Sequence, residues 1–183
     1  MKVHFFLLLS LGLLFAVAQV PADLTLRADK TKSYLTYSAK HPLHAWSGTT
    51  RKVDCLLVYD GTTKSFRKVA VSAQVADFDS ENANRDSHAL EVLEAIRFPK
   101  VTFSSTSIAQ DGDKLVISGK LNFHGKPQDI TFTGEAKVTA KGIEVQGTFP
   151  VSMKKFDVEP PSFMLMATED TLKISFAVYF EIP

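Results

Sequence analysis

The sequence predicts an all-β protein with antiparallel strands and one inserted helix. Apolar and polar residues alternate with period two along much of the chain, as in strands that bury one face. Turns that contain glycine separate the alternating segments. One segment near the middle of the chain has the spacing of a helix instead.

The alternation is clearest in residues 143–153, whose apolar positions are Ile143, Val145, Gly147, Phe149, Val151 and Met153. The same pattern predicts strands at 69–75, 115–123, 130–138 and 172–180, and a further strand is expected at 101–108. Strands with one apolar face are typical of antiparallel sheets. Such strands close into a barrel or fold into a sandwich, and periodicity alone does not choose between the two.

Short turns make consecutive strands neighbours. Glycine lies where a positive φ costs little, in the segments Asp60-Gly61, Asp111-Gly112-Asp113, His124-Gly125-Lys126-Pro127 and Lys141-Gly142.

Three glycines, Gly119, Gly134 and Gly147, lie between bulky residues on the apolar faces of predicted strands. They either bend the strand and make room for neighbouring aromatic rings, or keep an elongated cavity open. The sequence leaves both readings open.

The segment 82–96 predicts a helix. Its apolar residues Leu90, Leu93 and Ile96 recur every three positions. Asn82 or Asn84 can cap its N-terminus, and a Phe-Pro pair follows its C-terminus. A helix inserted between strands lies across the sheet or at one end of it, so we expect it to act as a lid or plug.

The N-terminus has the composition of a secretory signal peptide. Lys2 and His4 precede an apolar run that ends in Ala16-Val17-Ala18. This run is shorter than the roughly 20 residues that a membrane-spanning helix needs. We therefore expect cleavage after residue 18, export, and a single soluble domain formed by residues 19–183.

Composition rules out an intramolecular disulfide and argues against nucleic-acid binding. Cys55 is the only cysteine, so the chain cannot form an intramolecular disulfide, and we expect this residue to be a small buried hydrophobe. The net charge is +1 with no basic stripe, which disfavours nucleic-acid binding.

Four motifs resemble, in this order, the YceI-like family: His41-Pro42-Leu43-His44-Ala45-Trp46-Ser47-Gly48, Asn82-x-Asn84-Arg85-Asp86-x-His88, Phe98-Pro99-x-Val101-Thr102-Phe103 and Gly119-x-Leu121-x-Phe123-His124-Gly125. The resemblance covers the chain from about Asp23 to the C-terminus. It implies a lipocalin-like antiparallel β-barrel of eight strands with a polyisoprenoid in its interior, usually in the bacterial periplasm. The segments 126–128 and 156–166 depart from the family pattern, so the shape of the cavity and the identity of the lipid are not carried over.

A lipid-binding barrel needs an apolar interior and a polar end. Side chains expected to hold the tail of the ligand are Trp46, Phe78, Phe103, Phe123, Phe132, Phe149, Met164, Met166, Phe176 and Phe180. A second set, His41, His44, Arg85, Asp86 and His88, would either contact a lipid head group or anchor the helix to loop carbonyls near His41 and Trp46. The resemblance to the YceI-like family implies an isoprenoid lipid, of the prenyl quinone or prenyl phosphate type, as the partner.

A metal site is disfavoured. His41 and His44 with His124 could ligate zinc, but Pro42 prevents a continuous helix there and no cysteine or glutamate signature accompanies them. We expect no metal and no cofactor.

Catalysis is also disfavoured. The sequence contains no Gly-x-Ser-x-Gly segment, and the adjacent Ser87 and His88 would point in different directions on a helix. Two alternatives to a lipid binder stay open: a structural or stress-related barrel with a filled core, and an enzyme acting on a small apolar substrate. The sequence does not separate carriage, storage and sensing of a lipid, and it leaves a homodimer open.

Overall fold

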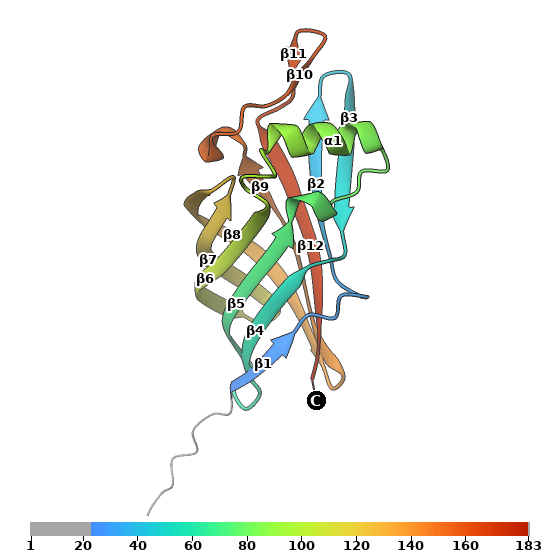
Figure 1. The fold of residues 1–183 in the computed structure, drawn as a ribbon. Coiled ribbons are helices and arrows are strands. Elements are labelled where there is room, and N and C mark those ends of the chain that lie inside the picture. Colours follow the sequence, from blue (N-terminus) through green and yellow to red (C-terminus); the bar gives the residue numbers. More distant parts are fainter. Residues whose placement is uncertain (1–22, 183) are drawn as a thin grey trace, which may run out of the picture.

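The computed structural model describes residues 23–182, so the predicted signal peptide, residues 1–18, lies outside them. Within this range ten strands form one antiparallel sheet in the order β1-β4-β5-β6-β7-β8-β9-β12-β2-β3 (Figure 1). These strands are β1 (Asp23–Arg27), β2 (Tyr34–His41), β3 (His44–Thr50), β4 (Asp54–Asp60), β5 (Ser65–Gln74), β6 (Lys100–Asp111), β7 (Lys114–Phe123), β8 (Lys126–Thr139), β9 (Gly142–Ser152) and β12 (Thr171–Glu181).

The other elements of the described range cover or extend one end of this sheet (Figure 1). They are the 3-10 helices η1 (Val75–Asp77) and η2 (Lys154–Phe156), the α-helix α1 (Ala83–Val92), and a hairpin of β10 (Ser162–Phe163) and β11 (Met166–Ala167). The all-β prediction with one inserted helix is confirmed. The sheet of residues 23–182 has ten strands and not the expected eight; the β2–β3 hairpin lies beyond β12 at one side, and the short β1 lies beyond β4 at the other.

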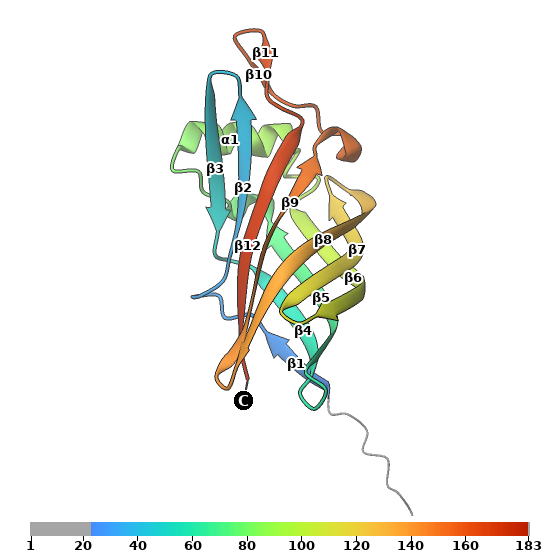
Figure 2. The ribbon, with the colours of Figure 1, turned by 180° about the vertical axis from the view of Figure 1, so that it is seen from behind.

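The sheet curls so that the end of β1, one of its edge strands, reaches β12 (Figure 2). Ala28, just after β1, forms an antiparallel bridge with Phe180 of β12. At the other end Thr49 of β3 bridges to Asp79, with N–H···O distances of 2.9 and 3.0 Å. The ten strands are thus one continuous curled sheet, and the sandwich reading is wrong for this part of the chain.

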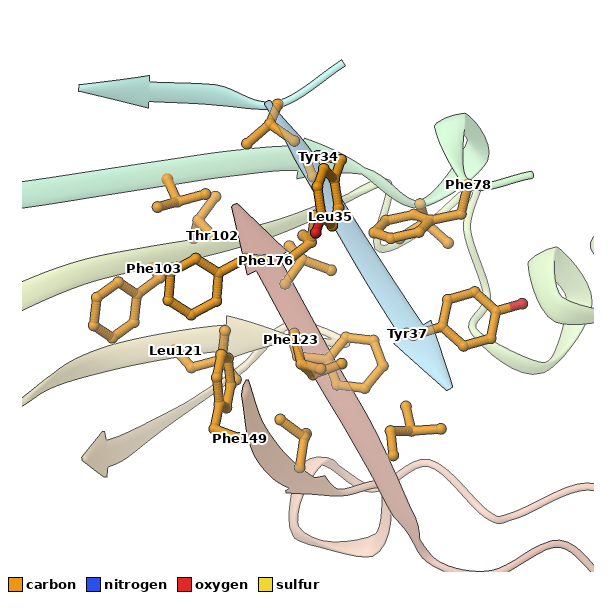
Figure 3. A pocket seen from close by; sticks show the side chains of 18 of the residues that line it. Tyr34, Leu35, Tyr37, Phe78, Thr102, Phe103, Leu121, Phe123, Phe149 and Phe176 are labelled. Atoms are coloured by element: carbon orange, nitrogen blue, oxygen red, sulfur yellow. The ribbon is translucent and has the colours of Figure 1, made fainter. Parts of the chain in front are cut away.

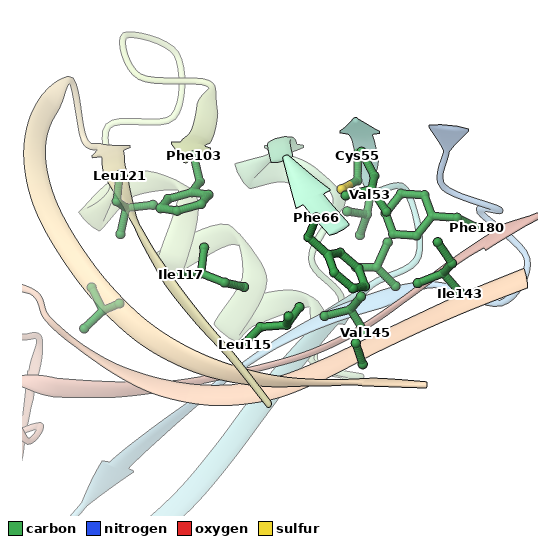
Figure 4. Close-up of a cluster of buried hydrophobic side chains, with 14 of the residues drawn as sticks. Val53, Cys55, Phe66, Phe103, Leu115, Ile117, Leu121, Ile143, Val145 and Phe180 are labelled. Carbon is green, nitrogen blue, oxygen red and sulfur yellow. The ribbon is translucent and has the colours of Figure 1, made fainter. Parts of the chain in front are cut away.

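The alternation that predicted the strands places side chains in the core. In β7, Leu115, Ile117, Leu121 and Phe123 are buried, whereas the charged and polar residues between them are exposed or half-buried. Figure 4 shows the first three of these side chains converging with others from across the sheet. Each large apolar side chain buried in this way contributes about 1.5–3 kcal/mol to folding.

Strands β1 to β4 were not predicted. β4 contains a run of five apolar residues from position 55 to position 59 and so shows no alternation. Much of β2 and β3 forms a hairpin that is only partly buried, so its pattern is weak.

At the turn between β7 and β8, residues of two of the sequence motifs pack against each other. His124 and Gly125 have φ values of 51° and 69°, as a tight two-residue hairpin turn requires. A Cβ atom on Gly125 would lie 2.4 Å from the ring of Phe98, which also packs on His124 with ring centroids 4.5 Å apart. The strand resumes at once, so Lys126 and Pro127 belong to β8 and not to the predicted turn.

Other turns differ in detail from the prediction. Gly112 has the expected positive φ, but Gly61 and Gly142 do not, and Lys64 adopts the left-handed conformation in the β4–β5 turn.

Helix α1 is shorter than expected. Asn82 caps it, since its side-chain oxygen accepts a hydrogen bond from the backbone N–H of Arg85 at 3.1 Å. Glu94 has a φ of 44° and donates to the carbonyl of Glu91, and the N–H of residue 95 donates to the carbonyl of residue 90, which is the pattern of a Schellman motif. This motif ends the helix early and leaves Ile96 fully exposed. In residues 23–182 we find no helix with the length and apolar character needed to cross a bilayer.

Candidate apolar cavity

An internal cavity of about 290 Å³ lies inside the curled sheet. Its walls come from strands of the sheet and from α1, and most of the lining side chains are aliphatic or aromatic. The volume is close to the lower end of the roughly 300–1,000 Å³ typical of ligand pockets, and far exceeds the roughly 30 Å³ share of one water molecule. The cavity argues against the alternative of a structural barrel with a filled core.

Aromatic rings from four strands make one wall of the cavity (Figure 3). Phe132 of β8 stacks on Phe149 of β9 with centroids 4.4 Å apart. Phe103 of β6 and Phe176 of β12 meet Phe132 edge-on, at 5.4 and 5.9 Å. Because these residues lie on the inner faces of their strands, the period-two pattern brings them together.

The glycines on the apolar faces make room for these rings. A Cβ on Gly119 would lie 2.6 Å from Cζ of Phe103, and one on Gly147 would lie 2.8 Å from Cζ of Phe176. Neither glycine is among the described residues that line the cavity. Of the two readings left open by the sequence, the structure favours space for neighbouring aromatic rings.

The structure places eight of the ten predicted tail-binding residues on the cavity wall: Trp46, Phe78, Phe103, Phe123, Phe132, Phe149, Phe176 and Phe180. Met164 and Met166 are not among the lining residues, since both belong to the β10–β11 hairpin that projects beyond the sheet. Met164 is exposed, and the backbone carbonyl of Met166 accepts a hydrogen bond from Nε2 of His41 at 3.0 Å. Contact of the eight residues with a ligand stays a prediction.

Helix α1 supplies the charged residues among the described lining residues, Arg85 and Asp86, and also His88. Both carboxylate oxygens of Asp86 accept from the backbone N–H of Ser80, at 3.2 and 3.3 Å, and Nη1 of Arg85 donates to the Ser80 carbonyl at 3.2 Å. The guanidinium of Arg85 also lies 5.8 Å from the ring centre of Trp46. The two side chains therefore fasten the helix to Ser80, two residues before its cap, and not to loop carbonyls near His41 and Trp46 as expected.

A second depression, of about 300 Å³, adjoins the cavity at this end. His41, His44, Arg85 and His88 line it together, so the structure gathers four of the five predicted polar residues. The pairing of His41 with His44 at the end of β2 and β3 sets their rings 5.1 Å apart. Trp46, Arg85 and His88 line both spaces, so the apolar cavity and the depression are neighbours at this end.

His124 lies in a different environment from the histidines of the depression. Its Nδ1 donates to the carbonyl of Phe156 at 3.1 Å, and its Nε2 is 3.4 Å from the carboxylate of Glu94. Residues 23–182 contain no cluster of three histidine, cysteine or acidic side chains placed to hold a metal ion. The zinc arrangement considered for His41, His44 and His124 is therefore not formed.

The sequence reasoning missed Tyr37, which lines the cavity from β2. Its ring packs against Phe78 at 5.7 Å, and burial raises the pKa of its phenol. A Cβ on Gly48 would lie 2.5 Å from this ring, so the glycine of the first motif leaves space for the tyrosine. The alternation of Leu35, Tyr37 and Ala39 was a usable signal.

Cys55 is buried, as predicted, and burial raises the pKa of its thiol to about 12. It also lines the cavity, a position that its residue type did not reveal. Other lining residues outside the predicted set include Leu35, Val69, Val71, Ala73, Leu172 and Ile174.

The family model of the YceI-like domain matches residues 26–180. The chain belongs to the YceI-like family. Protein YceI of Escherichia coli O157:H7 is 30% identical over 146 residues, which cover 75% of each chain. Protein YceI of Salmonella newport strain SL254 is 30% identical over 140 residues, covering 74% of this chain and 72% of the relative. The resemblance drawn from the four motifs is confirmed.

Solved structures share the YceI-like fold. BcnA of Burkholderia cenocepacia superposes with a TM-score of 0.75 at 21% identity, over 83% of this chain and 98% of the other. A polyisoprenoid-binding domain from Saccharophagus degradans, implicated in plant cell wall breakdown, gives a TM-score of 0.68 at 14% identity, over 86% of this chain and 98% of that domain.

Proposed function

We propose that this YceI-like protein binds a long apolar molecule of the isoprenoid lipid class in its internal cavity. The observation that carries the proposal is the apolar cavity, with its wall of aromatic rings, inside the curled sheet. Family membership and the polyisoprenoid-binding domain from Saccharophagus degradans support the choice of ligand class.

The energetics suit an isoprenoid tail. At about 0.8 kcal/mol for each buried methylene, a five-carbon unit contributes roughly 3–4 kcal/mol before ordering costs. A tail of a few isoprene units is therefore enough for useful affinity. A longer tail would extend further but would add little to the affinity. The tail would occupy the aromatic part of the cavity, and the head group would face Arg85 and His88 at its polar end, where a guanidinium suits a phosphate.

We propose binding and not catalysis as the role of the cavity. The charged groups on its wall stabilise the fold, since Arg85 and Asp86 both form hydrogen bonds with the backbone of Ser80. An enzyme that acts on a small apolar substrate is the alternative, and analysis of added lipid for turnover products distinguishes it. Carriage, storage and sensing all fit the same cavity.

We also propose export to the periplasm, which is supported by the signal-like composition of residues 1–18. N-terminal sequencing of the protein from its native cell should begin at Gln19. A chain that retains its first eighteen residues would contradict this.

The ligand is tested by organic extraction and mass spectrometry of the protein purified without denaturation from its native cell. Buffer alone and an unrelated protein serve as controls. We expect a prenyl lipid in stoichiometric amount. A ligand-free protein that also fails to take up prenyl quinones and prenyl phosphates would overturn the proposal.

A further inference from the structure

Two hairpin tips at the polar end of the cavity carry exposed apolar side chains. Leu43 lies between β2 and β3 and is 58% exposed, whereas Met164 and Leu165 lie between β10 and β11 and are 69% and 104% exposed. Single exposed apolar residues are ordinary on protein surfaces. These three are gathered at the ends of two hairpins that extend past α1 at the same end of the molecule (Figures 1 and 2).

The two hairpins are fastened to each other. The backbone N–H of Glu169 donates to the carbonyl of Lys40 at 2.8 Å, and the side chains of these two residues form an ion pair, also at 2.8 Å. The hydrogen bond from His41 to the carbonyl of Met166 adds a third link. The apolar tips are therefore held as one unit, which we call the tip pair (residues 42–43 and 164–165).

The residues at the second tip do not suit the turn that they form. Met164 and Leu165 have φ values of 50° and 61°, in the left-handed region where two-residue hairpin turns normally place asparagine or glycine. Two large apolar side chains thus occupy strained positions and contribute no burial to the fold. Such strain points to a role for these side chains outside the fold.

The tip pair also lies beside the depression that adjoins the cavity. His41 and His44 line this depression from one hairpin, and Pro161, Ser162 and Thr168 line it from the segment that carries the other. A surface that met both tips would lie near this depression, which shares Trp46, Arg85 and His88 with the cavity.

We propose that the tip pair inserts into the surface of a lipid bilayer and holds the entrance of the cavity against it, so that an apolar ligand can pass between membrane and protein. This inference rests on the proposed function. Three side chains expose at most a few hundred Å², against the roughly 800 Å² that each partner buries in a stable protein interface. Narrow apolar tips suit the shallow insertion of about 5–10 Å seen at lipid interfaces.

The charges at the tip pair define the kind of membrane. Lys40 and Glu169 neutralise each other at its base, so this pair does not recruit anionic lipids. Binding should therefore occur on neutral lipids and change little with salt, because insertion of apolar groups is not screened.

Flotation of the purified protein with neutral phosphatidylcholine vesicles, at low and high salt, tests the inference. The test variant combines Met164→Asn, Leu165→Gly and Leu43→Ser, and its Asn-Gly pair suits the turn, so the hairpin should be retained. The control, Val116→Thr with Val138→Thr, removes two exposed aliphatic side chains from β7 and β8. We expect the wild type and the control to float at both salt concentrations, and the test variant to bind about tenfold less or weaker still, because it loses the inserted side chains.

A separate measurement keeps this inference distinct from the proposed function. Affinity for a detergent-solubilised prenyl quinone should be the same in the wild type and the test variant, whereas uptake of that quinone from vesicles should slow about tenfold or more in the variant, in line with its lost membrane affinity. A wild type that binds no quinone in detergent counts against the proposed function alone. Equal flotation of the test variant and the wild type, a need for anionic lipid, or dimerisation through the tips without flotation would each overturn the inference.

Discussion

Asp60, in the last position of β4, is a fully buried carboxylate that stays charged. Hydrogen bonds from Thr63, from Arg67 and from the backbone N–H of Thr62 hold the pKa of Asp60 well below its usual range, although burial acts in the opposite direction. The Arg67 contact, from Nη2 to Oδ2, is 2.6 Å long. A carboxyl group with a lowered pKa stabilises the folded state whenever it is ionised.

We predict that acid destabilises the protein through Asp60. Its contribution is fully present above the ordinary aspartate pKa of 3.8 and is lost as the pH falls below that value toward the lowered pKa of the folded state. Urea denaturation at a series of pH values measures this. Asp60→Asn should lower the free energy of unfolding at pH 7 and flatten its dependence on pH, whereas Asp129→Asn, at an exposed site, should leave the slope nearly unchanged.

Gly119 provides a second prediction at the scale of the residue. A Cβ there would lie 2.4 Å from the carbonyl oxygen of Ser104, which cannot move freely, and against the ring of Phe103. Gly119→Ala should therefore reduce the free energy of unfolding by about 1–3 kcal/mol. In the control Gly61→Ala the nearest atom is 3.6 Å away, so little change is expected, and equal losses in the two variants would contradict this account.

At the scale of the element, α1 depends on its cap. The sequence offered Asn82 and Asn84 as alternatives, and the structure selects Asn82, which accepts from the N–H of Arg85. Asn82→Ala should lower the free energy of unfolding by about 1 kcal/mol. Asn84→Ala is the matched control, and thermal denaturation that shows the same loss for both variants would refute the assignment.

The elements differ in how far they could be predicted. β7 has alternating residues with one face in the core, so its pattern alone predicted it. The end of α1 could not be predicted, because Glu94 adopts a left-handed backbone conformation that is uncommon for glutamate. β4 was not predicted because apolar and polar residues do not alternate in its apolar run.

At the scale of the whole molecule, the cavity can be tested by filling it. Val71 lines the cavity from β5, and Val116 is partly exposed on β7. Val71→Phe should reduce affinity for a prenyl quinone about tenfold or more, because the added ring takes the space of several methylenes of the ligand. Val116→Phe controls for the same substitution outside the cavity, and circular dichroism verifies the fold. Equal affinity in the two variants would place the ligand elsewhere.

The sequence by itself determined the strand period, the inserted helix, the burial of Cys55 and the family, since each depends on local pattern or on motifs. The tertiary structure decided how the sheet closes, because the bridges of Ala28 to Phe180 and of Thr49 to Asp79 join residues far apart in the chain. That closure places Trp46 beside Arg85 and forms a cavity lined by the aromatic rings. A cavity is the difference between the volume enclosed by the backbone and the volume of the side chains within it, and local periodicity encodes neither.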